Sequence, residues 1–291
     1  MSIPLTDRRL KIELSGITIE FICKRGVQLI ISEYIKSFVS DNSPDLIFNI
    51  YKRKILNTNF GIKLLDANPW TIYFNEKDKE LYWLNISNNM LPPTQIVLKK
   101  NANYVDIYLD FQDNHYVSSI IYLLCPTLLS YLLVPYQALV VHSCAIKVRE
   151  NGYLFSGLSG AGKSTICNLF KDEFDVIPLC DERIIIRNIN DIFYIYGTPW
   201  FSSAKVALPT YTRLDTIYFI SHSTENIITY KEKKAAIASL ISHSYLPMWD
   251  HSKMSDIIKF TEILTNQIPC YDLGFLPDKS IIKFLRLNGK S

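Results

Sequence analysis

The stretch at residues 157–165, GLSGAGKST, constrains this chain more than any other feature of its sequence. It matches G-x-x-x-x-G-K-[ST], the pattern of a phosphate-binding P-loop. Glycines let the backbone direct several N–H groups at one anion, and the positive end of the following helix points at the same place. The pattern has meaning only between a strand and a helix, and residues 153–155 and 164–170 have the apolar spacing of these two elements. We therefore expect a site for a nucleoside triphosphate.

Each residue type in the loop has a chemical role. Lys163 is expected to reach the β- and γ-phosphates, and the Ser164 hydroxyl to bind Mg²⁺. The residues expected to contact the nucleotide are Gly157, Leu158, Ser159, Gly160, Ala161, Gly162, Lys163, Ser164 and Thr165. ATP and Mg²⁺ are thus the expected cofactors, although a P-loop contacts phosphates and does not distinguish ATP from GTP.

Two acidic residues follow the next apolar segment. Residues 175–179 resemble a strand, and Asp181 and Glu182 stand at its end. Two acids at a strand end are ordinarily a solvated edge, but beside a P-loop they are the usual second Mg²⁺ contact. The expected metal ligands are therefore Ser164, Asp181 and Glu182. Strand alternation predicts Asp181 and Arg183 on one face and Glu182 on the other.

Three further residues are candidates for the site. His142 lies in an apolar strand at residues 139–148, where a lone histidine is either a core residue or part of a site. Trp200 follows a Gly/Pro turn and is either a substrate platform or an anchored core residue. Arg213 either contacts a phosphoryl group or lies on the surface.

The rest of the sequence bounds the architecture. Residues 1–113 alternate in the manner of β-strands and form an expected β-rich subdomain, with a hairpin turn at Ser15-Gly16, and residues 114–291 form the expected P-loop domain. Trp70 and Trp83 are expected to pack within the first sheet. Residues 117–141 carry no charge, but Pro126 and Pro135 interrupt them, so a buried helix over residues 116–133 is expected instead of a membrane span.

Composition argues against several partners and compartments. The net charge of +3 comes from scattered basic residues, so we expect no nucleic acid partner. Six cysteines without C-x-x-C spacing indicate buried thiols in a reducing compartment, and the N-terminal residues do not resemble a secretory signal. We expect a cytoplasmic protein that does not contact membranes, and the sequence leaves open whether several copies assemble.

The order of these motifs resembles the HPr kinase/phosphorylase-like family, which belongs with the phosphoenolpyruvate carboxykinases. A strand with His142, a glycine turn, GLSGAGKST, a short helix and a strand ending in an acidic pair carry the resemblance, over residues 139–214. It implies an α/β fold with a P-loop kinase core. It also implies that Asp181 takes the proton from a serine hydroxyl, that His142 supports Asp181, and that Lys163 contacts phosphate. The catalytic residues expected on this basis are Asp181, His142 and Lys163.

The sequence also departs from this family. The acidic pair is Asp-Glu instead of Asp-Asp, Thr165 replaces an acid, and the C-terminal segment that recognises a protein substrate is not found. The resemblance is therefore closer to stand-alone relatives that phosphorylate free serine or the serine of a ribosomal peptide such as a lasso peptide precursor. A regulatory nucleotide-binding module with weak or no hydrolysis is the alternative, and a carboxykinase-like lyase is a third. The N-terminal subdomain is expected to recognise the acceptor or to mediate dimer contact.

Overall fold

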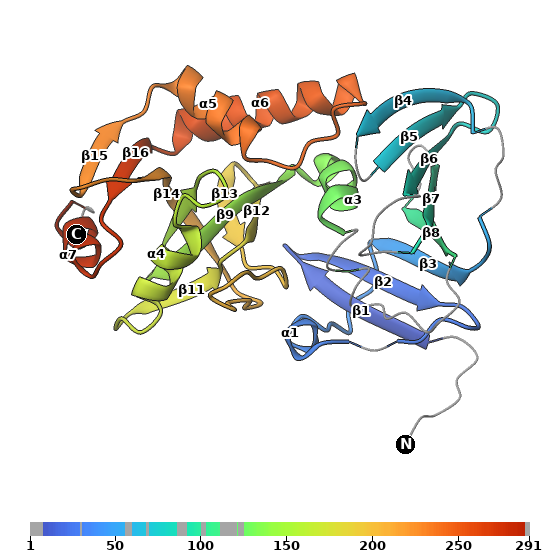
Figure 1. The fold of residues 1–291 in the computed structure, drawn as a ribbon, viewed down its shortest axis with the longest axis horizontal. Coiled ribbons are helices and arrows are strands. Elements are labelled where there is room, and N and C mark those ends of the chain that lie inside the picture. The colour runs from blue at the N-terminus through green and yellow to red at the C-terminus, as the bar shows by residue number, and fades with distance from the viewer. Residues whose placement is uncertain are drawn as a thin grey trace. The chain divides into compact units, whose positions relative to one another are not determined.

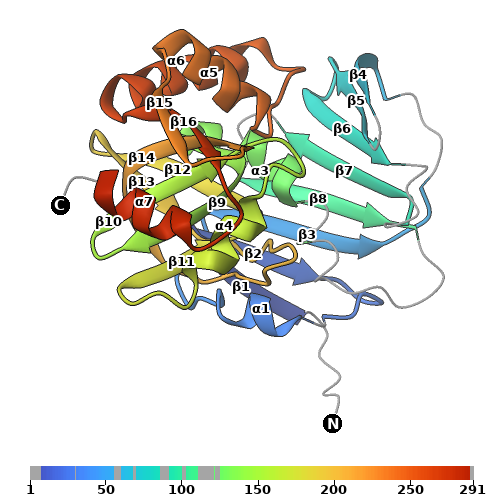
Figure 2. The same ribbon diagram turned by 60° about the vertical axis from the view of Figure 1, so that its left-hand side comes forward.

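The computed structural model describes residues 8–29, 31–55, 60–67, 70–85, 92–99, 103–110, 121 and 125–288. The chain divides into two compact units, Met1–Cys125 and Pro126–Ser291, and each unit contains one eight-stranded sheet (Figure 1 and Figure 2). The boundary predicted between residues 113 and 114 lies outside the described residues. The two units are described separately below.

The first unit is a mixed sheet with the strand order β1-β2-β3-β8-β7-β6-β5-β4. Its strands are β1 (Arg8–Leu14), β2 (Ile17–Cys23), β3 (Leu46–Lys52), β4 (Ile62–Ala67), β5 (Trp70–Asn75), β6 (Glu80–Asn85), β7 (Thr94–Lys99) and β8 (Tyr104–Leu109), with the short helix α1 (Glu33–Lys36). The pairs β2–β3 and β3–β8 are parallel, and the other neighbours are antiparallel.

Several predictions for this unit are confirmed. The hairpin turns at Ser15 and Gly16, which both have positive φ. Trp70 of β5 and Trp83 of β6 are buried, with ring centroids 6.2 Å apart, so they pack against each other in the core of this sheet. The sequence did not predict β4, because its side chains are mostly exposed and lack apolar alternation.

The second unit holds the P-loop. Its elements are α3 (Cys125–Leu132), η1 (Val134–Tyr136), β9 (Ala138–Val148), β10 (Asn151–Ser156), α4 (Lys163–Phe170), β11 (Val176–Cys180), β12 (Arg183–Ile189), β13 (Ile192–Tyr196), β14 (Tyr211–His222), β15 (Ile227–Tyr230), α5 (Lys233–Ser242), α6 (His251–Gln267), β16 (Cys270–Phe275) and α7 (Ser280–Asn288). The strand order is β10-β9-β12-β13-β14-β16-β15, with β11 paired to β9. β14 pairs with both β13 and β10. The strands β10, β9, β12, β13 and β14 therefore form a closed ring of hydrogen-bonded neighbours.

The predicted α/β kinase core is wrong, because strands dominate both units and each sheet is mixed. Among the described strands of the second unit, only the pairs β10–β14 and β14–β16 are parallel. The connections β9–β10 and β12–β13 are two-residue hairpins, and Asn190 and Asp191 in the second turn have φ of 51° and 62°. Turns with positive φ at both central residues match the twist of antiparallel strands. The single strand–loop–helix unit of the P-loop is therefore embedded in a mainly antiparallel sheet.

The uncharged segment before β9 follows the expected outline where it is described. α3 is eight residues long, η1 contains Pro135, and β9 begins at Ala138. The first part of the predicted helix, residues 116–120, lies outside the described residues. Among the residues that the structure describes, no helix is long and apolar enough to cross a bilayer.

A core residue of the P-loop strand β10 offers a test of this fold. Phe155 is fully buried, and its ring stacks on Phe170 and Tyr218 at centroid distances of 6.4 and 5.4 Å. We predict that Phe155→Ala lowers the free energy of unfolding by about 3–5 kcal/mol, because it leaves a cavity in this stack. Urea denaturation measures the change. Phe174→Ala is the matched control, since Phe174 is 86% exposed, and an equal loss in both variants would contradict this packing.

Candidate active site

The P-loop has the strand–loop–helix context that its motif requires. β10 ends at Ser156, the loop turns through Gly160 and Gly162 with φ of 82° and 99°, and α4 begins at Lys163. A side chain at Gly162 would also collide with Phe275, because a Cβ there would lie 2.6 Å from Cζ. Only glycine satisfies both the conformation and the space at this position. The N–H groups of the first turn of α4 therefore face the loop, as an anion site requires.

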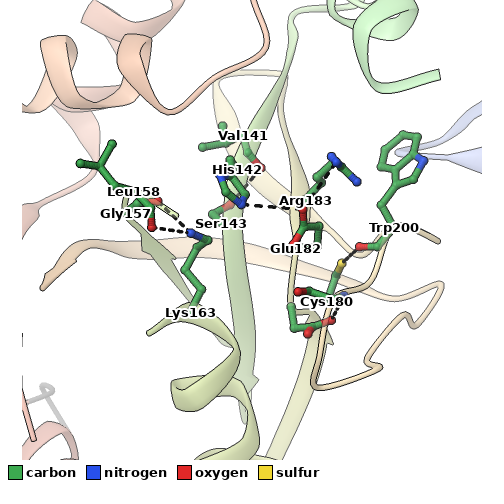
Figure 3. Close-up of polar contacts among 12 residues, drawn as sticks. Val141, His142, Ser143, Gly157, Leu158, Lys163, Cys180, Glu182, Arg183 and Trp200 are labelled. Atoms are coloured by element: carbon green, nitrogen blue, oxygen red, sulfur yellow. Dashed lines mark hydrogen bonds and ion pairs between the residues drawn. The ribbon is translucent and has the colours of Figure 1, made fainter. Parts of the chain in front are cut away.

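Lys163 lies at the centre of this loop. Its side chain is buried, and Nζ donates hydrogen bonds to the carbonyl oxygens of Gly157 and Leu158, both at 2.9 Å (Figure 3). Burial lowers the pKa of the amine, while Cys144 and, to a smaller extent, the charge of Glu182 oppose that shift. The amine is thus held at the loop in a place where a phosphate could compete for its protons.

The residues of the loop fit a phosphate and a magnesium ion. Ser164 is half-buried in the first turn of α4, directly after Lys163. Among the described residues no cluster of three His, Cys, Asp or Glu side chains has the arrangement of a metal site. Mg²⁺ on a nucleotide needs only one or two protein oxygens, because phosphates and waters supply the others. The hydroxyl of Ser164 and the carboxylate of Glu182 are suitable donors.

Glu182 and His142 form the second part of the site. The last residue of β10, Ser156, pairs with Ser143 of β9. His142 is the next residue of β9 beyond this pair, so it emerges beside the P-loop (Figure 3). Its Nε2 lies 3.8 Å from Oε1 of Glu182, and Nη2 of Arg183 lies 3.5 Å from the same oxygen. Burial and then the charge of Lys163 lower the pKa of His142, while Glu182 opposes them. Glu182 therefore shares one environment with Lys163 and His142.

Asp181 is placed differently from its neighbour. It is fully buried, and its carboxylate accepts backbone N–H groups from Ser202 at 3.0 Å, Ala204 at 2.8 Å and Val206 at 3.3 Å. Such a carboxylate holds a loop in place, and three of its roughly four lone-pair sites already accept hydrogen bonds. The predicted separation of Glu182 from Arg183 by strand alternation is not observed, because residues 181 and 182 form a bend between β11 and β12 and the two side chains are ion-paired.

The other two candidates occupy a core position and an exposed position. Trp200 is fully buried, and its carbonyl oxygen accepts a hydrogen bond from Sγ of Cys180 at 2.8 Å. Arg213 pairs with Asn151 at the start of β10, whereas the P-loop follows the end of that strand. Five strand residues span about 17 Å. Trp200 is therefore a core anchor, and Arg213 is an exposed residue at the opposite end of β10.

The structure adds residues that the sequence did not predict. Oγ of Ser156 lies 3.0 Å from Nδ1 of His243, which belongs to the connector between α5 and α6. Nε2 of His222 lies 2.8 Å from the carbonyl oxygen of Gly160 and so supports the P-loop from β14. The hydroxyl of Tyr245 accepts a hydrogen bond from Nε of Arg183 at 2.7 Å. Isolated histidines and tyrosines outside a motif gave no signal in the sequence.

The thiols agree with the sequence-based expectation where their side chains are described. Cys23, Cys144, Cys167, Cys180 and Cys270 are buried and free. Burial raises the pKa of Cys23 and of Cys270 to about 12, so both stay protonated at neutral pH.

The chain matches no protein-family model and no curated protein. The resemblance to the HPr kinase/phosphorylase-like family therefore depends on the motifs in residues 139–214 alone.

The role of Asp181 as a loop anchor can be tested by stability. We predict that Asp181→Asn lowers the free energy of unfolding by about 1–3 kcal/mol, because an amide NH₂ would face backbone N–H donors. Denaturant unfolding gives the size of the loss, and limited proteolysis should cut within residues 200–207 more rapidly. Asp191→Asn in the β12–β13 turn is the control. Equal stability of the two variants would show that Asp181 is not an anchor.

His243 should make stability depend on pH. Burial, followed by the charges of Lys163 and Lys231, lowers the pKa of His243, so the folded state favours the neutral ring. The unfolded chain then binds a proton more readily, and stability falls as the pH decreases below the ordinary histidine value of about 6.5. We predict a smaller loss of stability between pH 7 and pH 5 for His243→Gln than for wild type. His251→Gln, at an exposed position, should behave like wild type, and the prediction fails if the two variants have the same pH dependence.

Proposed function

We propose that this protein is a Mg²⁺-dependent kinase that transfers the γ-phosphoryl group of ATP to an alcohol. The acceptor is a serine hydroxyl of a peptide (such as a ribosomal peptide precursor), of a protein or of free serine. One observation carries the proposal: Oε1 of Glu182 lies 3.8 Å from Nε2 of His142, which emerges beside the P-loop and Lys163 (Figure 3). A phosphate cradle and a carboxylate–imidazole pair in one place are the parts that phosphoryl transfer to an alcohol requires.

The chain's residues have distinct roles in the proposed reaction. Lys163 and the loop N–H groups bind the β- and γ-phosphates and neutralise charge on the transferring group. Glu182 accepts the proton of the acceptor hydroxyl while the new O–P bond forms, and the bond from the γ-phosphorus to the β-phosphate oxygen breaks to release ADP. His142 orients Glu182. Bound Mg²⁺, with the Ser164 hydroxyl as a donor, would supply further positive charge to the phosphates.

This proposal assigns the base to Glu182 in place of Asp181. Glu182 is partly exposed and faces His142, whereas the oxygens of Asp181 are occupied by three backbone N–H groups. A general base must come within hydrogen-bond distance of the proton that it accepts. Asp181 would meet this condition only if residues 202–206 left their present positions.

The occupied carboxylate of Asp181 also favours a second candidate function. If the family's base position is structural in this chain, the P-loop could serve a regulatory module that binds nucleotide and hydrolyses it slowly or not at all. Such a module would depend on Lys163 for binding, and neither acidic residue would affect acceptor phosphorylation.

The test measures ADP formation from Mg·ATP with and without free serine and serine-containing peptides. We predict turnover that is stimulated by an acceptor, that is lost in Lys163→Ala, and that falls by about 10²–10⁴-fold in Glu182→Gln. Glu150→Gln is the matched control, because Glu150 is 90% exposed in the β9–β10 turn. Nucleotide binding is measured in parallel by calorimetry.

The outcomes separate the two candidates. A kinase with Glu182 as base keeps nucleotide affinity in Glu182→Gln while its turnover collapses. Nucleotide binding without acceptor-stimulated turnover in wild type would refute the kinase and favour the regulatory module. Full activity in Glu182→Gln, together with loss of activity in Asp181→Asn at a temperature where that variant is folded, would show that Asp181 is the general base.

A further inference from the structure

The connector between α5 and α6 attaches directly to β9 beside the P-loop. The N–H of His142 donates to the carbonyl oxygen of His243 at 2.7 Å, and the N–H of Tyr245 donates to that of Val140 at 3.0 Å. Ser244 forms an isolated bridge with Val141 between these two bonds. The connector thus extends the pairing of β9 past the end of β10, and this fixes where Tyr245 lies.

Tyr245 contacts the acidic part of the site through Arg183. Its hydroxyl accepts a hydrogen bond from Nε of Arg183 at 2.7 Å, and the guanidinium carbon lies 5.5 Å from the centre of its ring. Nη2 of Arg183 then lies 3.5 Å from Oε1 of Glu182, and the same oxygen lies 3.8 Å from Nε2 of His142. These contacts therefore form one continuous network from the connector to His142.

This chain of contacts is partly shielded from solvent. The side chains of Arg183 and Glu182 are 16% and 20% exposed, so their interaction is screened less than that of a surface ion pair. A guanidinium is planar and rigid, and fixing its Nε and its face leaves it few orientations. Arg183 is thereby held toward Glu182, and this pairing competes with attraction of Glu182 to Lys163, which must contact phosphate.

We propose that Tyr245 is a positioning residue for the proposed kinase reaction. It holds Arg183, and Arg183 keeps the carboxylate of Glu182 directed at His142 and the acceptor and away from Lys163. This inference depends on the proposed function, in which Glu182 accepts the proton. Tyr245 acts only through Arg183, so the effects of changing the two residues should not add.

The kinetic test uses the full chain with Tyr245→Phe, Arg183→Lys and the double variant. We expect Tyr245→Phe to lower kcat about tenfold with KM for ATP within twofold of wild type, because the phosphate cradle is untouched. The double variant should lose no more than about twofold beyond Arg183→Lys, as residues in one network are not additive. Tyr230→Phe is the control, since Tyr230 is 54% exposed and Phe keeps its ring contact with Tyr271.

A second measurement is independent of turnover. In protein labelled with ¹³C at glutamate carboxyl groups, the Glu182 signal is assigned by its loss in Glu182→Gln. We expect this signal to move in both Tyr245→Phe and Arg183→Lys and to stay in place in Tyr230→Phe. Thermal unfolding shows whether Tyr245→Phe is folded to the same extent as wild type.

Each result has a defined meaning. Three results would overturn the positioning role. They are losses in kcat that add in the double variant, a loss of ATP affinity in Tyr245→Phe as large as its loss of kcat, and a Glu182 signal that does not move in Tyr245→Phe. Absence of acceptor-stimulated turnover in wild type refutes the proposed kinase instead. In that case the Glu182 signal alone decides whether Tyr245 positions the carboxylate.

Discussion

Backbone pairing along β9 is the constraint on which the site depends. β10 pairs with one edge of β9 and leads into the P-loop, while β11 and β12 pair with the other edge and carry the acidic residues between them. The α5–α6 connector adds its own backbone bonds to β9 near His142. One strand therefore sets the positions of the phosphate cradle, the acidic pair, the histidine and the connector. Sites built on strands hold their groups more accurately than sites built on loops.

Two adjacent acidic residues have different surroundings because of a loop that follows them in the chain. Asp181 faces the backbone N–H groups of residues 202–206 and is fully buried, while Glu182 faces His142 and remains partly exposed. Matching by residue type to the family that the motifs resemble favours Asp181 as the base. Burial and hydrogen bonding favour Glu182, and neither property follows from the local sequence.

Local features of the chain could be predicted from sequence, and long-range pairing could not. The P-loop, the strand before it, the helix after it and the hairpin at Ser15-Gly16 each depend on residues close together in the chain. The α/β class was wrong because the pattern of one strand–loop–helix unit was taken to describe a whole domain. The pairing of β10 with β14, which lies far along the chain, could not be predicted from that unit. Arg183 and Tyr245 are 62 positions apart in the chain, and no sequence motif indicates that they are in contact.

The most direct test of this account is a crystal structure of the protein with Mg²⁺ and a non-hydrolysable ATP analogue. The account predicts phosphates within residues 157–164, with Nζ of Lys163 moved from the carbonyl oxygens of Gly157 and Leu158 to the phosphates. It also predicts Glu182 facing the γ-phosphate and Asp181 still bound to the N–H groups of residues 202–206. A nucleotide bound elsewhere, or Asp181 released and facing the γ-phosphate, would contradict it.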